Sequence, residues 1–164
     1  MIESQPVDLS KIIIARKWSY IEWNMHHSNL TMEEFIKNQK SLGIKTDAMT
    51  ESHYKQQASL EKILGLFERK PKVLIGETLT KKLLSTASLV ISLGGDDHLK
   101  YVSHFIGDQL ALPLNSDYER SEGGMISYLP EDFKRLLPKL KKGDYEIEEC
   151  QDYKLPYSTP TVRL

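Results

Sequence analysis

The sequence predicts an α/β fold in which a parallel sheet has helices on both faces. Short apolar or β-branched runs alternate along the chain with segments of helical periodicity, and this order is typical of parallel sheets with right-handed helical crossovers. The run from Leu89 to Leu93 is apolar enough to be an interior parallel strand. At 164 residues, the chain has the length of one domain with one good core.

The first predicted elements are a strand and a helix. The segment from Lys11 to Arg16 contains three consecutive isoleucines and predicts the first strand. Thr31 is a helix-capping residue, and Glu34 three positions later gives the capping-box spacing. The aromatic residues between these two elements are expected to cover the edge of the core: Trp18, Tyr20 and Trp23.

A second helix is predicted at 54–69, where apolar residues recur on one face at helical spacing. Pro71 ends it. The elements that follow alternate in type: a strand at 73–75, a helix at 80–85, a strand at 89–93, a helix at 97–107, a strand at 111–114 and a helix at 133–140. The last segment, 144–149, alternates in hydropathy like an edge strand.

The composition argues against several classes of function. The net charge is −1 with many charges of both signs, so no basic face for nucleic acid is expected. The single cysteine, Cys150, excludes an internal disulfide framework and a CxxC metal site, and it suits a reducing compartment. No apolar stretch has the length of a membrane span, and Met1 to Ser10 lacks the pattern of a secretory signal. We therefore expect a cytoplasmic protein.

Two glycines and two aspartates directly follow the third predicted strand, in the order Gly94-Gly95-Asp96-Asp97-His98. Glycines at this position let backbone amides approach an anion, and the start of the next helix faces the same place. A carboxylate beside a phosphate can take a proton from a hydroxyl nucleophile or hold a magnesium ion. The alternative is a tight turn whose aspartates only cap the helix.

A polar loop follows the next predicted strand at the same edge of the sheet, and it extends from Asn115 to Gly124. Ordering so polar a loop is costly unless it serves a function. The side chain of Asn115 can donate and accept hydrogen bonds, and Arg120 can bind a phosphate or carboxylate through two N–H groups. Alternatively, Arg120 pairs with Glu119 or Glu122 in a solvated loop.

These two segments resemble the amino-terminal domain of NAD kinases. That family carries Gly-Gly-Asp-Gly-Thr after a strand, which Gly94, Gly95 and Asp96 match, and an asparagine after the next strand, which Asn115 matches. Residues 115–123 are similar in particular to the Asn-Thr-Asp-Pro-Glu-Arg-Ser-Glu-Gly loop of the mitochondrial-type NAD kinases. The resemblance implies a Rossmann-like, phosphofructokinase-like sheet, and a mitochondrial location becomes the alternative to the cytoplasm.

The resemblance also implies an activity. NAD kinases transfer a phosphoryl group, usually from ATP with Mg²⁺, to the adenosine-ribose 2′-hydroxyl of NAD and so form NADP. Asp96 matches the catalytic carboxylate that accepts the hydroxyl proton, and Asn115 matches the residue that holds the NAD ribose or adenine. No residue is assigned as a metal ligand. The residues expected to bind substrate or nucleotide are Gly94, Gly95, Asp97, His98, Asn115, Ser116, Asp117 and Arg120.

Two residues of the first motif depart from the family. Asp97 stands where the family has glycine, and a like charge ~4 Å from the donor phosphates costs about 4 kcal/mol at an effective dielectric constant of 20. Pyrophosphate-using phosphofructokinases have a similar aspartate, so polyphosphate is a second expected donor beside ATP. His98 replaces a threonine and removes a small hydroxyl donor.

The domain organisation is predicted from the same resemblance. Residues 1–149 are expected to form the α/β nucleotide-binding domain, and residues 150–164 a linker or tail toward a β-rich carboxy-terminal domain. That domain carries an Asn-Glu pair in NAD kinases, and no such dipeptide occurs here. The expected assemblies are a homo-oligomer or a complex with a partner chain that supplies the missing domain. The alternative is a degenerate or truncated noncatalytic domain for nucleotide binding or interaction.

Overall fold

The computed structural model describes residues 4–120, 124–151 and 158–163. Its centre is a six-stranded sheet with the strand order β2-β1-β3-β4-β6-β5. The strands are β1 (Ile12–Arg16), β2 (Lys72–Ile75), β3 (Leu89–Leu93), β4 (Leu110–Leu114), β5 (Glu146–Gln151) and β6 (Ser158–Arg163). The pairs among β2, β1, β3 and β4 are parallel, β6 is parallel to β4, and β5 is antiparallel to β6.

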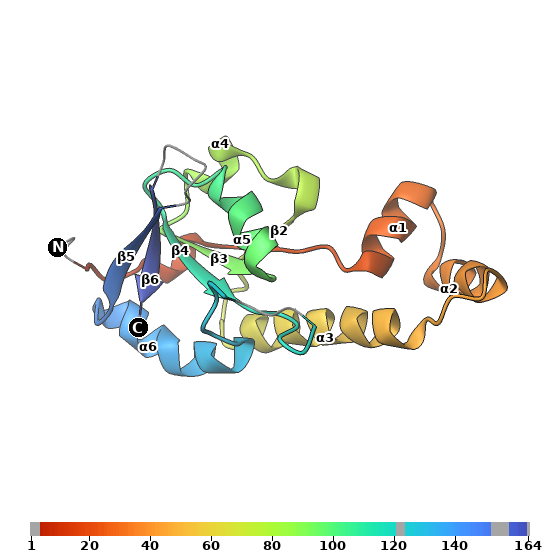
Figure 1. The fold of residues 1–164 in the computed structure, drawn as a ribbon. Coiled ribbons are helices and arrows are strands. Elements are labelled where there is room, and N and C mark those ends of the chain that lie inside the picture. Colours follow the sequence, from red (N-terminus) through yellow and green to blue (C-terminus); the bar gives the residue numbers. More distant parts are fainter. Residues whose placement is uncertain (1–3, 121–123, 152–157, 164) are drawn as a thin grey trace.

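Helices lie on both faces of this sheet (Figure 1). The helices of the described residues are α1 (Tyr20–Ser28), α2 (Met32–Ser41), α3 (Asp47–Leu64), α4 (Lys81–Leu84), α5 (Asp96–Ser103) and α6 (Phe133–Lys142), of which α3 to α6 pack on the sheet. The described residues also form three short 3₁₀ helices: η1 (Leu9–Lys11) before β1, η2 (Gly76–Thr78) after β2 and η3 (Pro130–Asp132) before α6. Among the described residues, no helix is both long and apolar enough to cross a lipid bilayer.

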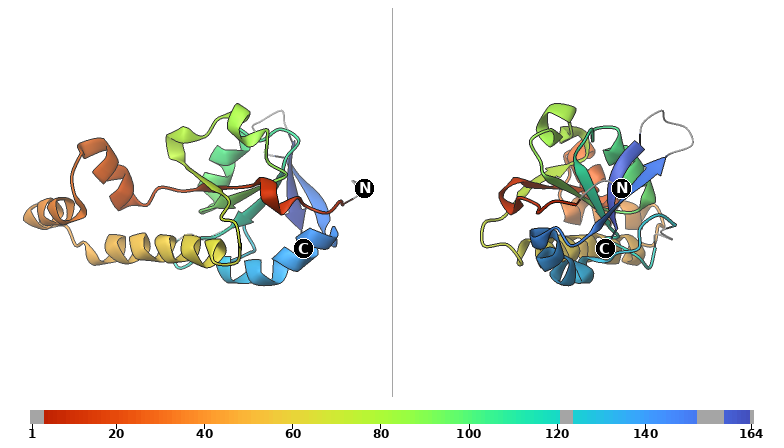
Figure 2. Two further views of the ribbon diagram at one scale, coloured as in Figure 1. Left: turned by 180° about the vertical axis from the view of Figure 1, so that it is seen from behind. Right: turned by 90° about the vertical axis from the view of Figure 1, so that its left-hand side faces the viewer.

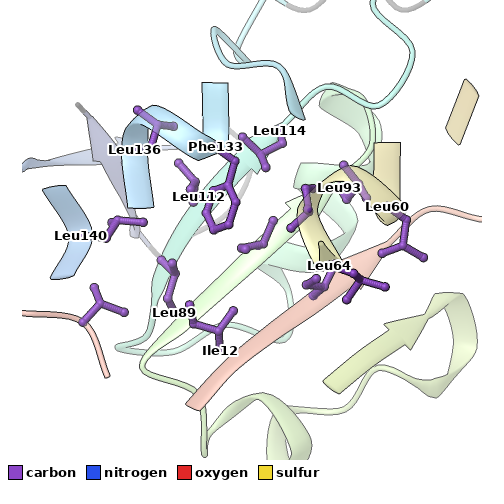
Figure 3. Packing of buried hydrophobic residues seen from close by; sticks show 14 of the residues in the cluster. Ile12, Leu60, Leu64, Leu89, Leu93, Leu112, Leu114, Phe133, Leu136 and Leu140 are labelled. Atoms are coloured by element: carbon purple, nitrogen blue, oxygen red, sulfur yellow. The ribbon is translucent and has the colours of Figure 1, made fainter. Parts of the chain in front are cut away.

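Because side chains along each strand alternate between the two faces of the sheet, the apolar core consists of two clusters, one on each face. In β3, Leu89 and Ile91 belong to the cluster formed with α3 and α6, whereas Val90 belongs to the cluster on the other face, with α4 and α5. Figure 3 shows the first cluster, where Leu60 and Leu64 of α3 and the apolar side of α6 cover the strands. Each fully buried aliphatic side chain contributes about 1.5–3 kcal/mol to the stability of the fold. Because both clusters contain such side chains, packing on both faces stabilises the sheet.

The helices α1 and α2 and the first half of α3 project from the sheet as a helical arm (Figure 1). A capping box between Ser19 and Glu22 begins α1 only three residues after β1. This helix carries Tyr20 and Trp23 away from the sheet and leaves them 57% and 46% exposed. The prediction that these residues cover the core edge is therefore wrong for Tyr20 and Trp23, because the capping box starts a helix that leads away from the core, whereas Trp18 before the helix is half-buried.

The structure confirms the predicted class of fold. Each of the five predicted strands is present, with bounds within two residues of those expected. Two helices differ: α3 begins and ends earlier than 54–69, and α5 covers 96–103 instead of 97–107. The first half of α3 is polar and packs through hydrogen bonds such as that between Ser19 and His53, so its apolar periodicity starts late.

The strand β6 differs from the expected linker at 150–164. Residues 158–163 pair antiparallel with β5 along six residues, and Thr161 lies opposite Ala111 of β4. Pro160 lies within the strand and has no N–H to donate to a ladder. The proline suggested a linker, but the backbone of β4 and β5 offers partners that a local sequence pattern does not reveal.

Candidate functional site

The candidate site lies between β1 and β3, where the order of the strands in the sheet reverses. From β1 the chain passes to β2 on one side, and β3 lies on the other side of β1. In open α/β sheets, ligands bind outside the carboxyl ends of the strands at such a switch point. Here Lys17 follows β1 and Gly94 follows β3, and the amide of Lys17 donates to the carbonyl of Leu93 at 2.9 Å. The predicted glycine motif therefore occupies the switch point.

Gly94 has to be a glycine because of His98. A Cβ at Gly94 would lie 2.7 Å from the Cβ and Cδ2 atoms of His98, which is closer than side chains tolerate. The amide of Gly94 donates to the carbonyl of Leu114 at 3.0 Å, and Gly95 is the residue that precedes α5. The first glycine thus permits close packing of the helix on the strand.

His98 is buried beneath this turn. Its Nε2 donates to the carbonyl of Ala15 in β1 at 3.0 Å, and the residue is 7% exposed. The pKa of His98 is lowered to about 4, chiefly because burial disfavours the charged ring; the bond to Ala15 raises the pKa and the positive charge of Lys17 lowers it. At neutral pH the ring is uncharged and ties α5 to β1. We find it in contact with the protein backbone, where the sequence suggested contact with a ligand.

Asp96 is the first residue of α5, and its two carboxylate oxygens have different surroundings. Oδ2 accepts from the amides of Gly124 and Met125 at 2.8 and 3.1 Å. Oδ1 is buried and has no hydrogen-bond partner among the described residues. The amide of His98 donates to the carbonyl of Gly95 at 3.0 Å. The first amides of a helix have no carbonyl one turn before them and therefore favour an anion at this end. The carboxylate is thus held in place through Oδ2, and Oδ1 is a buried acceptor that a hydroxyl can reach only if the turn moves to uncover it.

Asp97 points outward. Its side chain is 98% exposed and lies 3.8 Å from the ammonium of Lys100. In surroundings this close to bulk water, a like charge ~4 Å away costs about 1 kcal/mol. The repulsion of donor phosphates expected from the sequence is therefore small.

The loop after β4 packs on α3. Asn115, Ser116 and Asp117 are all buried, at 3%, 6% and 7% exposure. The Oδ1 atom of Asn115 accepts from the amide of Asp117 at 3.1 Å, and the carbonyl of Ser116 accepts from the hydroxyl of Ser59 at 3.1 Å. The hydroxyl of Ser52 donates to Oδ2 of Asp117 at 2.5 Å, while Oδ1 of Asp117 is buried without a hydrogen bond among the described residues.

Arg120 is paired, and its main partner belongs to α3. Its Nη2 lies 2.7 Å from a carboxylate oxygen of Glu51, and its Nη1 lies 3.7 Å from Asp117. Glu119 instead pairs with Lys55 of α3 at 2.5 Å. The sequence correctly suggested a carboxylate partner for Arg120 but placed it within the loop; Glu122 lies outside the described residues.

The two predicted motifs meet at one edge of the sheet. Leu93 and Leu114, the last residues of β3 and β4, are in register, so Gly94 and Asn115 follow neighbouring strands. Sequence reasoning missed the amides of Gly124 and Met125 as the groups that hold Asp96. Backbone donors carry no residue signature, so no sequence signal identifies them.

A magnesium ion has few protein ligands here. Among the described residues, no group of three or more His, Cys, Asp or Glu side chains is placed to hold a metal. Mg²⁺ in phosphoryl transfer is commonly bound by one or two carboxylates together with the phosphates of the substrate. The unpartnered Oδ1 of Asp96 is a ligand of this kind, but the same atom cannot hold Mg²⁺ and accept a proton at once.

No protein-family model matches this chain, and no curated protein matches its sequence. Several chains of solved structures are similar. One of them is the crystal structure of yeast NADH kinase complexed with NADH, with a TM-score of 0.42 and 13% sequence identity. The match covers 96% of this chain and 47% of the yeast chain, so this chain spans about half the length of that protein. The function proposed below rests on the residues and geometry of this chain.

Proposed function

We propose that this chain is an NAD kinase-like phosphotransferase domain. Its reaction transfers a phosphoryl group from ATP or polyphosphate to the adenosine-ribose 2′-hydroxyl of NAD and forms NADP. The observation that carries the proposal is Asp96 at the switch point, with Oδ2 held by two amides and Oδ1 buried and unpartnered. The likeness of residues 94–96 and 115–123 to the NAD kinase motifs, the latter of mitochondrial type, supports it.

In this reaction Asp96 acts as the general base. The 2′-hydroxyl donates its hydrogen to Oδ1, the new bond forms between the 2′-oxygen and phosphorus, and the bond from phosphorus to the donor's bridging oxygen breaks. The proton moves to Asp96, and the leaving phosphate keeps the electron pair of the broken bond. Because the transition state is loose, alignment contributes more than proton removal. The two amides that fix Oδ2 provide that alignment.

The donor phosphates lie at the start of α5 in this proposal. The helix N-terminus and the ammonium of Lys17 at the end of β1 provide positive potential there. Mg²⁺ bound to the donor phosphates would neutralise part of their charge, while Oδ1 of Asp96 serves as the base. The outward direction of Asp97 leaves ATP acceptable beside polyphosphate.

Asn115 is proposed to bind the ribose or adenine of NAD at the neighbouring strand end. Ser116, Asp117 and Arg120 then act as the support of this loop, since their contacts go to α3. This arrangement also favours a second candidate, a noncatalytic nucleotide-binding or interaction domain, because a loop so fully bonded to its own protein has few groups left for chemistry.

The test is to incubate the purified chain with NAD, Mg²⁺ and either ATP or polyphosphate and to measure NADP. We expect NADP to form and Asp96→Asn to reduce the rate at least a hundredfold, the usual contribution of a general base. Asp108→Asn is the matched control, since Asp108 is exposed and lies beyond the other end of α5.

The outcomes separate the two candidates. Activity that survives Asp96→Asn removes the proposed role of this residue. Absence of NADP with either donor, together with NAD binding in calorimetry, supports the noncatalytic domain. Absence of both activity and NAD binding overturns both functions.

A further inference from the structure

A cavity lies at the amino ends of β1 and β2, whereas Asp96 lies beyond the carboxyl end of β3. Its volume is about 750 Å³, and its walls include the first residues of β1 and β2, η1, the segment between α3 and β2, and the end of α6. β1 runs from this end of the molecule toward the helical arm (Figure 2). Five strand residues at ~3.3 Å each put the cavity about 15 Å from the switch point. It is therefore separate from the site already described.

The rim of this cavity is basic. Five cationic side chains line it, against the single carboxylate of Glu68: Lys11, Arg69, Lys70, Lys72 and Lys141. Lys11 lies 3.6 Å from Asp8, but the other four have no ion pair within the part of the chain that the structure describes. The whole protein has a net charge of −1, so this cluster of positive charges is a property of the cavity and not of the protein as a whole.

Interaction with a helix dipole accounts for only one of these cationic side chains. A lysine in the last turn of a helix is stabilised by the helix dipole, and this accounts for Lys141 of α6. Arg69 and Lys70 lie in a loop and Lys72 begins a strand, so no helix terminus accounts for them. Their positive charges repel one another unless an anion binds between them.

The cavity also offers apolar surface. Leu66 and Phe67 after α3 and Leu137 of α6 are half-buried and line it beneath the basic rim. Its volume lies within the range of about 300–1,000 Å³ that is typical of small-molecule sites. An extended nucleic acid would require cations spread along a face, and here they converge on one cavity.

We propose that this cavity binds a nucleotide-like polyphosphate, a small molecule that carries two or more phosphate groups on an aromatic or apolar part. The phosphates contact the rim formed by Arg69, Lys70 and Lys72, and the apolar part packs on Phe67. The site does not depend on the chemistry at Asp96.

The experiment uses ¹⁵N-labelled chain titrated with ATP in the absence of Mg²⁺ at 150 mM NaCl. We expect amide shifts in residues 65–72 in addition to any in residues 94–98, and calorimetry supplies the dissociation constant. Tripolyphosphate and adenosine serve as probes of the charged and apolar parts, and each alone should bind at least tenfold more weakly than ATP.

The variant Lys70→Glu/Lys72→Glu should raise the dissociation constant for ATP at this site at least tenfold. Lys141→Glu, on a different element, should act in the same direction, so that the result does not depend on one variant folding. Lys37→Glu/Lys40→Glu on α2 is the matched control, because it reverses two exposed charges elsewhere and should leave binding unchanged.

Three results would overturn the proposal. They are shifts confined to residues 94–98, affinity for ATP that is unchanged by both cavity variants, and tripolyphosphate that binds as tightly as ATP. The first would leave the site at Asp96 intact, whereas shifts confined to residues 65–72 would support this cavity and count against nucleotide binding at Asp96.

Discussion

The imidazole of His98 on α5 donates from Nε2 to the carbonyl oxygen of Ala15 on β1 at 3.0 Å, and this bond joins the two elements that border the switch point. The carbonyl can only accept, so the hydrogen must reside on Nε2. Because Asp96 lies two residues before His98, the bond also fixes the start of the helix that carries the proposed base. His98, which stands where the NAD kinase motif has threonine, thus links α5 to β1 by a buried hydrogen bond.

The first prediction concerns pH. The pKa of His98 is about 4 in the folded chain and 6.5 ordinarily, so the unfolded chain binds this proton first as the pH falls. Stability from this group is therefore complete above pH 6.5 and decreases between pH 6.5 and about 4, by roughly 3 kcal/mol in all. Urea unfolding at several pH values measures it. His98→Gln should flatten the profile in this window, and equal slopes in both proteins would contradict the assignment.

The second prediction concerns Arg16 and Glu22, which form a two-fold hydrogen-bonded pair at 2.7 and 2.8 Å. Burial raises the pKa of Glu22, but the bonds from Arg16, Ser19 and Gln57 outweigh it and leave the pKa at about 2. The folded pKa lies below the unfolded value of 4.5, so the stabilisation is present above pH 4.5 and is lost as the pH falls toward 2.

Glu22→Gln should therefore destabilise the chain by about 2–3 kcal/mol at pH 7, since it also leaves Arg16 without its carboxylate. The difference from the parent should shrink below pH 4.5 in chemical denaturation. Glu131→Gln is the matched control. It breaks the exposed pair with Lys62, which should contribute less than about 1 kcal/mol. Equal effects of the two variants would show that the partial burial of Glu22 has no energetic consequence.

The third prediction concerns Gly94. Gly94→Ala places a methyl group 2.7 Å from His98, and the helix α5 has to move or the side chain has to leave its rotamer. Overpacking of this kind costs about 1–3 kcal/mol. In contrast, Gly107→Ala meets only the flexible end of Gln109 at 3.7 Å and should be close to neutral. Thermal unfolding compares the two, and a neutral Gly94→Ala would show that the turn is loosely packed.

The fourth prediction concerns the loop after β4. Ser52→Ala removes the hydroxyl that donates to Asp117 and leaves a buried carboxylate oxygen with one partner fewer. We expect a loss of about 1–3 kcal/mol in stability and weaker NAD binding at Asn115, measured by calorimetry. Ser41→Ala, which removes an exposed bond to the carbonyl of Asn38, is the control. Unchanged NAD affinity in Ser52→Ala would show that the loop does not contribute to NAD binding.

Local sequence patterns were sufficient for five of the six described strands and for the position of the candidate base. The isoleucine run of β1 and the apolar run of β3 are strands in any context that buries them, and the glycines after β3 marked Asp96. The capping box at Thr31 likewise marked α2, because a capping signal depends on residues only three positions apart.

Contacts between distant residues decided the rest. Four features join residues that are remote in sequence or have no side-chain signature: the pairing of Arg120 with Glu51, the bond from His98 to Ala15, the amides that hold Asp96, and the strand β6. Periodicity and capping act within a few residues, whereas these partners are chosen by how helices and strands pack in space. The sequence by itself therefore determined the fold class and the edge at which chemistry is expected, and the tertiary structure decided which of the predicted side chains remain available there.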